Sequence, residues 1–278
     1  MKPETLTTKI FLDSGDPKDT ESMLSLLGFL DGQTTNPSLI AKSPGVQDKK
    51  FTKEELLDFY KETVQKISSL IPQGSVSVEV YADKSTTAEE MYQQGKEMFS
   101  WIPNAHIKYP TTKQGLKAAR ESIDEGMRVN MTLCFTQEQA AAVYGATKGA
   151  GKGDVFVSPF IGRLDDRGEN GMHLIANIIE MYKKGDGHVE VLTASVRTLD
   201  HFMHALKLGS DIITSPEEIL KEWADRGMPL TEDGQHEDSG LKEILQTLFG
   251  FRTNVPVGNE FISAKSAAFD SRLKNTEA

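Results

Sequence analysis

The chain has 278 residues, which is enough for one large domain or two small ones with a sizeable core. Its 38% hydrophobic and 26% charged composition is ordinary for a soluble globular enzyme. The formal net charge of −10 argues against a nucleic-acid-binding surface, although a few local arginines could still attract an anionic substrate into a cleft. The single cysteine, Cys134, excludes an intrachain disulfide, and the sequence shows neither the apolar segment of a signal peptide nor a run as long as a membrane span. We therefore expect a cytoplasmic protein with no nucleic-acid or membrane partner. The sequence does not determine its oligomeric state, and a homo-oligomer is possible.

Short β-rich runs alternate with longer segments of helical periodicity along most of the chain. Strands are expected at residues 10–13, 32–35, 75–80, 105–108, 128–133, 154–159, 188–194 and 211–214. Helices are expected near residues 18–30, 52–71, 86–101, 113–125, 136–146, 171–184, 198–207 and 216–226. Eight such βα units predict a parallel (β/α)8 barrel. The alternative, a doubly wound open sheet, usually has fewer strands and a glycine-rich turn after its first strand, which the segment after Asp13 lacks.

The pattern changes beyond Met228. Residues 231–238 form a charged stretch, and residues 241–249 and 263–273 have the periodicity of short amphipathic helices. We expect residues 1–228 to form the barrel, and residues 229–278 to form a helical extension that packs on it without a core of its own.

Polar residues close most of the predicted strands, at the end of a barrel where catalytic groups are found. They are Asp13, Asn36, Glu79, Lys108, Asn130, Thr132, Ser158, Arg163, Ser195 and Arg197. A lysine at the end of an apolar strand is costly unless it is paired or functional. Lys108 could belong to a buried structural ion pair, but similar endings on seven strands favour an active site in which this lysine forms an imine.

Seven colinear stretches, spread over about residues 9–226, carry a family resemblance. They are Phe11-Leu12-Asp13, Thr34-Thr35-Asn36-Pro37-Ser38-Leu39-Ile40, Val76-Ser77-Val78-Glu79-Val80, Ile107-Lys108-Tyr109-Pro110, Asn130-Met131-Thr132-Leu133, Val157-Ser158-Pro159-Phe160-Ile161-Gly162-Arg163-Leu164-Asp165-Asp166 and Ala194-Ser195-Val196-Arg197. With these stretches the sequence resembles the transaldolase family, apart from Tyr109, where the family more often has an aliphatic residue.

The resemblance implies that Lys108 is the Schiff-base nucleophile and Asp13 the acid/base group. An amine attacks a carbonyl only when it is unprotonated, so we expect burial and nearby cations to favour the neutral form of Lys108. The iminium would act as an electron sink for cleavage of the C3–C4 bond of a ketose, and no cofactor or metal is expected. Asp13 would remove the proton from the C4 hydroxyl during cleavage and return it during condensation.

Further roles follow from the same resemblance. Glu79 and Thr132 match the family pair that holds a catalytic water, which moves protons while the imine forms and hydrolyses. Asn36, Asn130 and Ser158 would hydrogen-bond the hydroxyls of the bound three-carbon fragment.

Arg163, Ser195 and Arg197 match the family's phosphate site. The guanidinium fork suits phosphate, and the loops late in a barrel are a frequent phosphate position. The other interpretation is that the arginines are surface ion-pair partners of Asp165 or Asp166.

Close relatives are distinguished at two positions. Ser158 and Phe160 follow the transaldolase pattern, whereas the fructose 6-phosphate aldolase branch has a tyrosine in place of Phe160 and an alanine two residues earlier. Deoxyribose-phosphate aldolases have a second lysine late in the barrel, where this chain has Ser195 and Arg197.

We therefore expect a transaldolase of the pentose phosphate pathway. It would transfer a dihydroxyacetone unit from sedoheptulose 7-phosphate or fructose 6-phosphate to glyceraldehyde 3-phosphate or erythrose 4-phosphate. The alternatives are an aldolase that releases free dihydroxyacetone and, more remotely, a non-catalytic barrel that binds sugar phosphates.

Overall fold

A computed structural model describes residues 2–43, 46 and 49–230 of the chain. Eight parallel strands close into a barrel in sequence order, with β1 paired to both β2 and β8. The strands are β1 (Lys9–Asp13), β2 (Gly32–Thr34), β3 (Ser75–Glu79), β4 (Ala105–Pro110), β5 (Val129–Cys134), β6 (Val155–Pro159), β7 (Val189–Thr193) and β8 (Ile212–Ser215). The predicted (β/α)8 barrel is thus confirmed and the open sheet is excluded.

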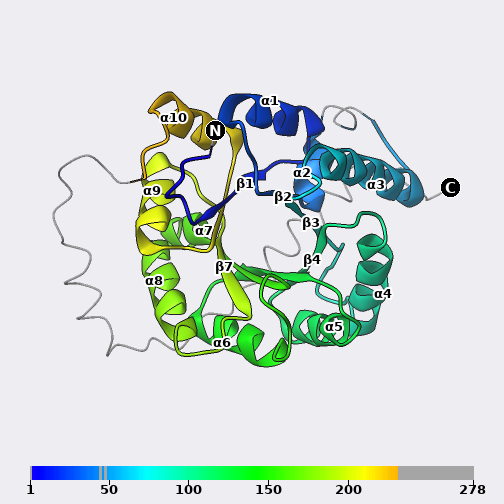
Figure 1. Ribbon diagram of the computed structural model, residues 1–278. Helices are drawn as coiled ribbons and strands as arrows, with labels where there is room; N and C mark the ends of the chain where they lie inside the picture. Colours follow the sequence, from blue (N-terminus) through cyan, green and yellow to red (C-terminus); the bar gives the residue numbers. More distant parts are fainter. Residues whose placement is uncertain (1, 44–45, 47–48, 231–278) are drawn as a thin grey trace.

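Helices surround the barrel, as Figure 1 shows in a view along its axis. They are α1 (Pro17–Leu27), α2 (Pro37–Lys42), α3 (Lys53–Leu70), α4 (Ala88–Phe99), α5 (Lys113–Asp124), α6 (Gln137–Ala146), α7 (Ile161–Asp165), α8 (Gly171–Tyr182), α9 (Leu199–Leu208) and α10 (Glu217–Asp225). All eight predicted helices are present. The predicted extension beyond Leu230 lies outside the described residues, so its packing on the barrel stays a prediction.

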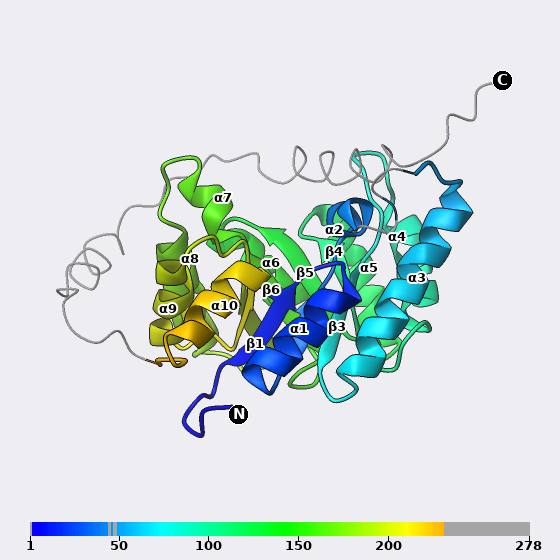
Figure 2. The same cartoon turned by 90° about the horizontal axis from the view of Figure 1, so that it is seen from above.

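Two short helices, α2 and α7, were not expected from the sequence. Each follows the end of a strand, and Figure 2 shows both at the same end of the barrel, opposite the end near the N-terminus. Helix α2 begins at an Asn36 cap followed by Pro37, a favoured residue for a first helical turn. Both helices therefore lie at the end of the barrel that carries the predicted active site.

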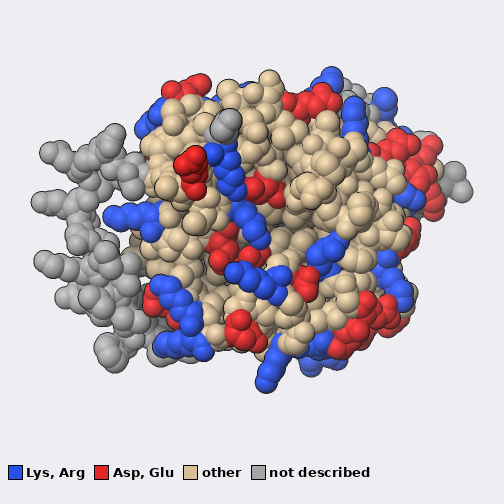
Figure 3. All heavy atoms as spheres, viewed as in Figure 1, with Lys and Arg blue, Asp and Glu red and all other residues tan. Residues whose placement is uncertain are grey.

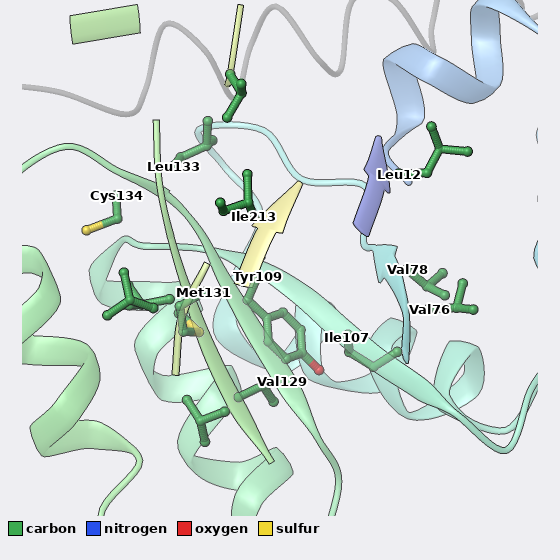
Figure 4. Packing of buried hydrophobic residues seen from close by; sticks show 14 of the residues in the cluster. Leu12, Val76, Val78, Ile107, Tyr109, Val129, Met131, Leu133, Cys134 and Ile213 are labelled. Carbon is green, nitrogen blue, oxygen red and sulfur yellow. The ribbon is translucent and has the colours of Figure 1, made fainter. Parts of the chain in front are cut away.

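Each strand divides its side chains between two cores because successive residues point to opposite faces. The outward core packs the strands against the helices, and Figure 4 shows Ile107, Tyr109, Val129 and Met131 within it. Tyr109, the neighbour of Lys108, therefore points away from the barrel axis and is fully buried. A side chain at Gly95 of α4 would place its Cβ 1.9 Å from the Tyr109 hydroxyl, so α4 needs a glycine where this ring ends.

The inside of the barrel is apolar on one side and polar on the other. A compact inner cluster comes from β1, β6, β7, the residue after β7, and β8, and its members are Phe11, Phe156, Leu192, Ala194 and Ile212. On the other side, Asn130 of β5 donates from Nδ2 to Ser77 Oγ of β3, 3.1 Å away and across β4. A polar half-barrel of this kind can hold a charged lysine where a fully apolar interior could not.

The N-terminal end of the barrel, here called the barrel floor, is closed by Lys9, Glu190, His106 and Phe156. Lys9 Nζ contacts both carboxylate oxygens of Glu190, at 2.9 and 3.0 Å. The His106 ring stacks on Phe156 with centroids 4.0 Å apart, and its two nitrogens contact Ser75 Oγ at 2.7 Å and the Gly153 carbonyl at 2.8 Å. Acidic and basic side chains lie close together around the centre of this face (Figure 3).

Candidate active site

Lys108 is buried near the C-terminal end of β4. Its Nζ lies 3.1 Å from Glu79 Oε2 and donates to the Thr35 carbonyl oxygen, also 3.1 Å away. Glu79 is the register partner of Lys108 on β3, and the side chains of the pair are 6% and 5% exposed. The contacts of the amine are thus oxygen acceptors, whereas the sequence suggested nearby cations.

The two residues that contact Lys108 are tied to a tyrosine from helix α3. The Tyr60 hydroxyl lies 2.8 Å from Thr35 Oγ1 and accepts a hydrogen bond from the Glu79 backbone N–H, 2.9 Å away. Burial raises the pKa of the Tyr60 phenol, so the hydroxyl stays protonated at neutral pH.

Asn130 and Ser158 are joined directly. Ser158 Oγ donates to Asn130 Oδ1 at 2.6 Å, while Asn130 Nδ2 donates to Ser77 Oγ. Both residues are buried, and Asn130 pairs in register with Lys108. The carboxamide is therefore fixed in orientation beside the lysine.

Asp13 ends β1 and is partly exposed, so a ligand can reach it. Its Oδ1 accepts a hydrogen bond from Thr34 Oγ1 at 2.6 Å. The Thr34 hydroxyl proton is used in this hydrogen bond. The Thr214 hydroxyl therefore donates to Thr34 Oγ1, which lies 2.7 Å away. Two threonines of β2 and β8 thus hold the carboxylate that the sequence predicted as acid/base group.

Thr132 and Asn36 offer groups to a ligand in different ways. The Thr132 hydroxyl is buried and makes no hydrogen bond to any residue that the structure describes. A buried hydroxyl without a partner is unfavourable, so this one suits a water molecule or a substrate. Asn36 uses its Oδ1 to cap α2, where it accepts from Leu39 N at 3.0 Å, and its amide nitrogen is the group that it could offer.

The predicted phosphate residues lie beyond the strand ends, on α7 and in the loop before α9. Arg197 makes a two-pronged ion pair with Asp166, and Arg163 Nη1 lies 3.5 Å from the same carboxylate. Arg197 holds the pKa of Asp166 below its ordinary value. Both arginines therefore form the ion pairs that the sequence allowed, with Asp166 as the partner. Asp165 instead contacts His201 Nε2 at 2.9 Å.

The backbone around this region is tight. Ser195 has a φ of 61°, and Leu133, next to Thr132, has a φ of 59°, in a region that costs a non-glycine residue roughly 1–2 kcal/mol. A Cβ at Gly162 would lie 2.4 Å from the Ser195 carbonyl and 2.6 Å from Arg197 Nε. Gly162 therefore allows α7 to approach the loop that carries Arg197.

Phe160 covers the inner apolar cluster from the catalytic end. It packs against that cluster, and its ring meets Phe135 edge-on with centroids 5.9 Å apart. A backbone bridge to Ala194 fixes its main chain. Phe160 therefore presents an apolar wall where the aldolase branch has a phenol.

The structure brings Lys108, Glu79, Asn130 and Ser158 into one connected site. Sequence reasoning missed the hydroxyl groups that link these residues, which belong to Thr35, Tyr60 and Ser77. It also missed those of Thr34 and Thr214, which hold Asp13 at the end of β1. Among the described residues, no three His, Cys, Asp or Glu side chains are gathered as a metal site. In the same part of the chain, no helix is long and apolar enough to cross a membrane.

The family model for Transaldolase/Fructose-6-phosphate aldolase matches residues 10–276. The chain belongs to this family. A protein of Dehalococcoides mccartyi named "Probable transaldolase" is 39% identical over 226 residues, which are 81% of this chain and 94% of that protein. Proteins with the same name from Cereibacter sphaeroides and Brucella ovis are each 42% identical over 228 residues, covering 81% of this chain and 91% and 92% of those proteins.

Solved structures with a similar fold are distant in sequence. A protein of Mesorhizobium loti, provisionally described as a dehydratase, superposes with a TM-score of 0.51 at 11% identity. The superposition covers 76% of this chain and 55% of that one, so this chain spans about half its length. The likeness concerns the barrel alone.

Proposed function

We propose that this chain is a transaldolase that transfers a dihydroxyacetone unit between sugar phosphates through an imine on Lys108. The observation that carries the proposal is the buried Lys108 amine, held 3.1 Å from the Glu79 carboxylate at the catalytic end of the barrel. The family match and the names of the relatives support the same chemistry.

Imine formation begins with attack of Lys108 Nζ on the ketose carbonyl carbon. The amine must first lose a proton, and Glu79 is the carboxylate in contact with it. Loss of water from the carbinolamine then needs a proton donor, which a water held between Glu79 and the Thr132 hydroxyl would supply. This role is supported by Thr132 Oγ1, which is buried and makes no hydrogen bond within the described part of the chain.

Cleavage follows when Asp13 takes the proton of the C4 hydroxyl. The electrons of the C3–C4 bond pass to the iminium, an aldose phosphate leaves, and a three-carbon enamine stays on Lys108. The enamine attacks the carbonyl of an acceptor aldose phosphate, Asp13 returns its proton to the new hydroxyl, and hydrolysis frees Lys108. The fixed Asn130 carboxamide and the Asn36 amide nitrogen would hold the hydroxyls of the retained fragment.

The phosphate would bind between Arg163 and Arg197, beside Ser195. Both guanidinium groups contact Asp166 in the structure, so the phosphate must share or replace that carboxylate. A dianion can do so because exposed ion pairs of this kind are weak.

The transferase is favoured over an aldolase by Ser158 and Phe160. An apolar wall at Phe160 offers no hydroxyl to protonate the enamine, so the three-carbon unit would wait for an acceptor aldehyde. The alternative is an enzyme of the same family that releases free dihydroxyacetone.

Borohydride reduction in the presence of fructose 6-phosphate tests the proposal. We expect irreversible inactivation and a reduced three-carbon adduct on Lys108, located by peptide mapping. An adduct on Lys113 or Lys117 would reassign the nucleophile, and no adduct at all would favour the non-catalytic barrel. Turnover measured with and without erythrose 4-phosphate separates the two enzymes, since fast release of dihydroxyacetone without an acceptor would identify the aldolase.

A further inference from the structure

Tyr60 lies outside the strands that build the site, on helix α3. It is 1% exposed, and its ring packs edge-on against Trp101 with centroids 5.9 Å apart. Its hydroxyl is the only part of the side chain that can hydrogen-bond, and it reaches the ends of β2 and β3.

The direction of each hydrogen bond at this hydroxyl can be derived from its neighbours. A backbone N–H can only donate, so the Tyr60 oxygen accepts from Glu79 N. The Thr35 hydroxyl donates to the Ser77 carbonyl at 2.8 Å, so its proton is already used. The Tyr60 O–H must therefore donate to Thr35 Oγ1, and one hydroxyl both donates and accepts.

These two partners are also the residues that contact the lysine amine. Lys108 Nζ is 3.1 Å from the Thr35 carbonyl and 3.1 Å from the Glu79 carboxylate. Both groups reach Lys108 from strands on one side of it, and the single hydroxyl of Tyr60 links the two residues.

We propose that Tyr60 is a positioning residue that sets the geometry of the Lys108 amine through Thr35 and Glu79. The inference rests on the proposed role of Lys108 as nucleophile. Without the hydroxyl, the Glu79 N–H would lose this buried hydrogen bond, and the link between the ends of β2 and β3 would be broken, so the two strand ends could shift relative to each other. Attack on a carbonyl is sensitive to such shifts, since a displacement of about 1 Å can cost on the order of 100-fold in rate.

The test is Tyr60→Phe, which removes one oxygen and keeps the ring against Trp101. We expect kcat to fall about 10-fold to 100-fold, while the KM for the ketose phosphate stays within about threefold, because the hydroxyl acts on the chemical step and not on substrate binding. Borohydride trapping should still label Lys108, but at a slower single-turnover rate.

Tyr182→Phe is the matched control. Tyr182 is also buried, and its hydroxyl donates to the Ala140 carbonyl at 2.7 Å, between α8 and α6 and away from the strand ends. It should lose stability in urea to a similar extent and keep its kcat. Equal loss of kcat in both variants, or full kcat in Tyr60→Phe, would overturn the proposal.

A double-mutant cycle with Thr35→Val sharpens the test. Valine keeps the carbonyl that contacts Lys108 but removes the hydroxyl that binds Tyr60, so the double variant should be hardly slower than either single one. Thr35→Ser keeps the hydroxyl and should stay close to the native rate, whereas additive losses would mean that the two residues act independently. Failure of wild-type trapping at Lys108 would instead refute the proposed function itself.

Discussion

The two ends of this barrel each contain a lysine–glutamate pair, yet the pairs differ in almost every other respect. At the floor, Lys9 is 40% exposed and binds both oxygens of Glu190. At the catalytic end, Lys108 is 5% exposed, and its amine contacts one carboxylate oxygen of Glu79 and the carbonyl oxygen of Thr35. The floor pair seals the barrel, whereas the buried pair leaves the amine at the strand ends where a substrate would bind.

The surroundings of the two pairs differ in the same direction. Both nitrogens of His106 at the floor have partners, and burial lowers its pKa to about 3, so the ring is neutral at physiological pH. At the catalytic end, the Thr132 hydroxyl has no partner among the described residues, and Asp13 is partly exposed. Polar groups whose hydrogen bonds are satisfied stabilise a fold, whereas polar groups with unused hydrogen-bonding capacity can bind a ligand.

The largest effect is expected when the same substitution is made in each lysine. Lys108→Met should lower transaldolase activity by on the order of 10⁴-fold or more, because no other group can form the imine. Lys9→Met should keep activity within about twofold, since the N-terminal face of such a barrel serves stability. Comparable activity losses in the two folded variants would remove the distinction between the ends.

A smaller loss of activity is expected when the ion pairs that Arg163 and Arg197 make with Asp166 are broken. Arg197→Ala should reduce kcat/KM for fructose 6-phosphate by roughly 10-fold to 150-fold, the worth of a charged hydrogen bond. Unphosphorylated fructose, measured in parallel, should lose much less. The same loss on both substrates would show that Arg197 acts on the fold or the chemistry, and the phosphate site would have to be sought elsewhere.

The smallest effect concerns His106 and the pH dependence of stability. The pKa of His106 in the folded chain, about 3, lies below its ordinary value of 6.5. Between these two pH values the unfolded chain therefore binds a proton at this histidine and the folded chain does not. Above pH 6.5 the neutral His106 ring does not reduce the free energy of unfolding. As the pH falls from 6.5 toward 3, that free energy decreases by about 1.4 kcal/mol per pH unit. Urea unfolding between pH 7 and 4.5 should therefore show a flatter profile for His106→Asn than for the native chain.

Tyr182→Phe provides the control for that measurement, because it removes a buried hydroxyl whose pKa is raised by burial and which does not titrate between pH 4.5 and 7. It should change the stability by a similar amount at each pH and leave the slope of the profile as it is in the native chain. An unchanged profile for His106→Asn would mean that the floor histidine titrates normally and that the floor is less dry than its geometry indicates.

Most of the fold was predictable because alternation of strands and helices is repeated eight times. The exceptions, α2 and α7, are six and five residues long, too short to show a helical period. Asn36 and Pro37 did carry the start signal of α2, but α7 begins without a side-chain cap.

The site was predictable where a polar residue interrupts an apolar strand, as Lys108 does. It was not predictable where a polar atom sits on a side chain that also packs well. Tyr60 falls on the apolar face of its helix with Val64 and Ile67, so only its contacts in space show what its hydroxyl does. The bridge from Asp166 to two arginines likewise depends on how α7 approaches the loop before α9.

The contact between Tyr109 and Gly95 links two positions that are distant along the chain. A larger residue at 95 can be accommodated only if the ring at 109 is replaced by something shorter, such as the aliphatic residue more usual in the family. A larger residue at 95 alone would displace α4 or push on the strand that carries Lys108, whereas a shorter residue at 109 alone would leave a cavity beside Gly95. Anyone grafting the whole of β4, Tyr109 included, onto a relative must therefore also transfer Gly95 from the outer ring of helices.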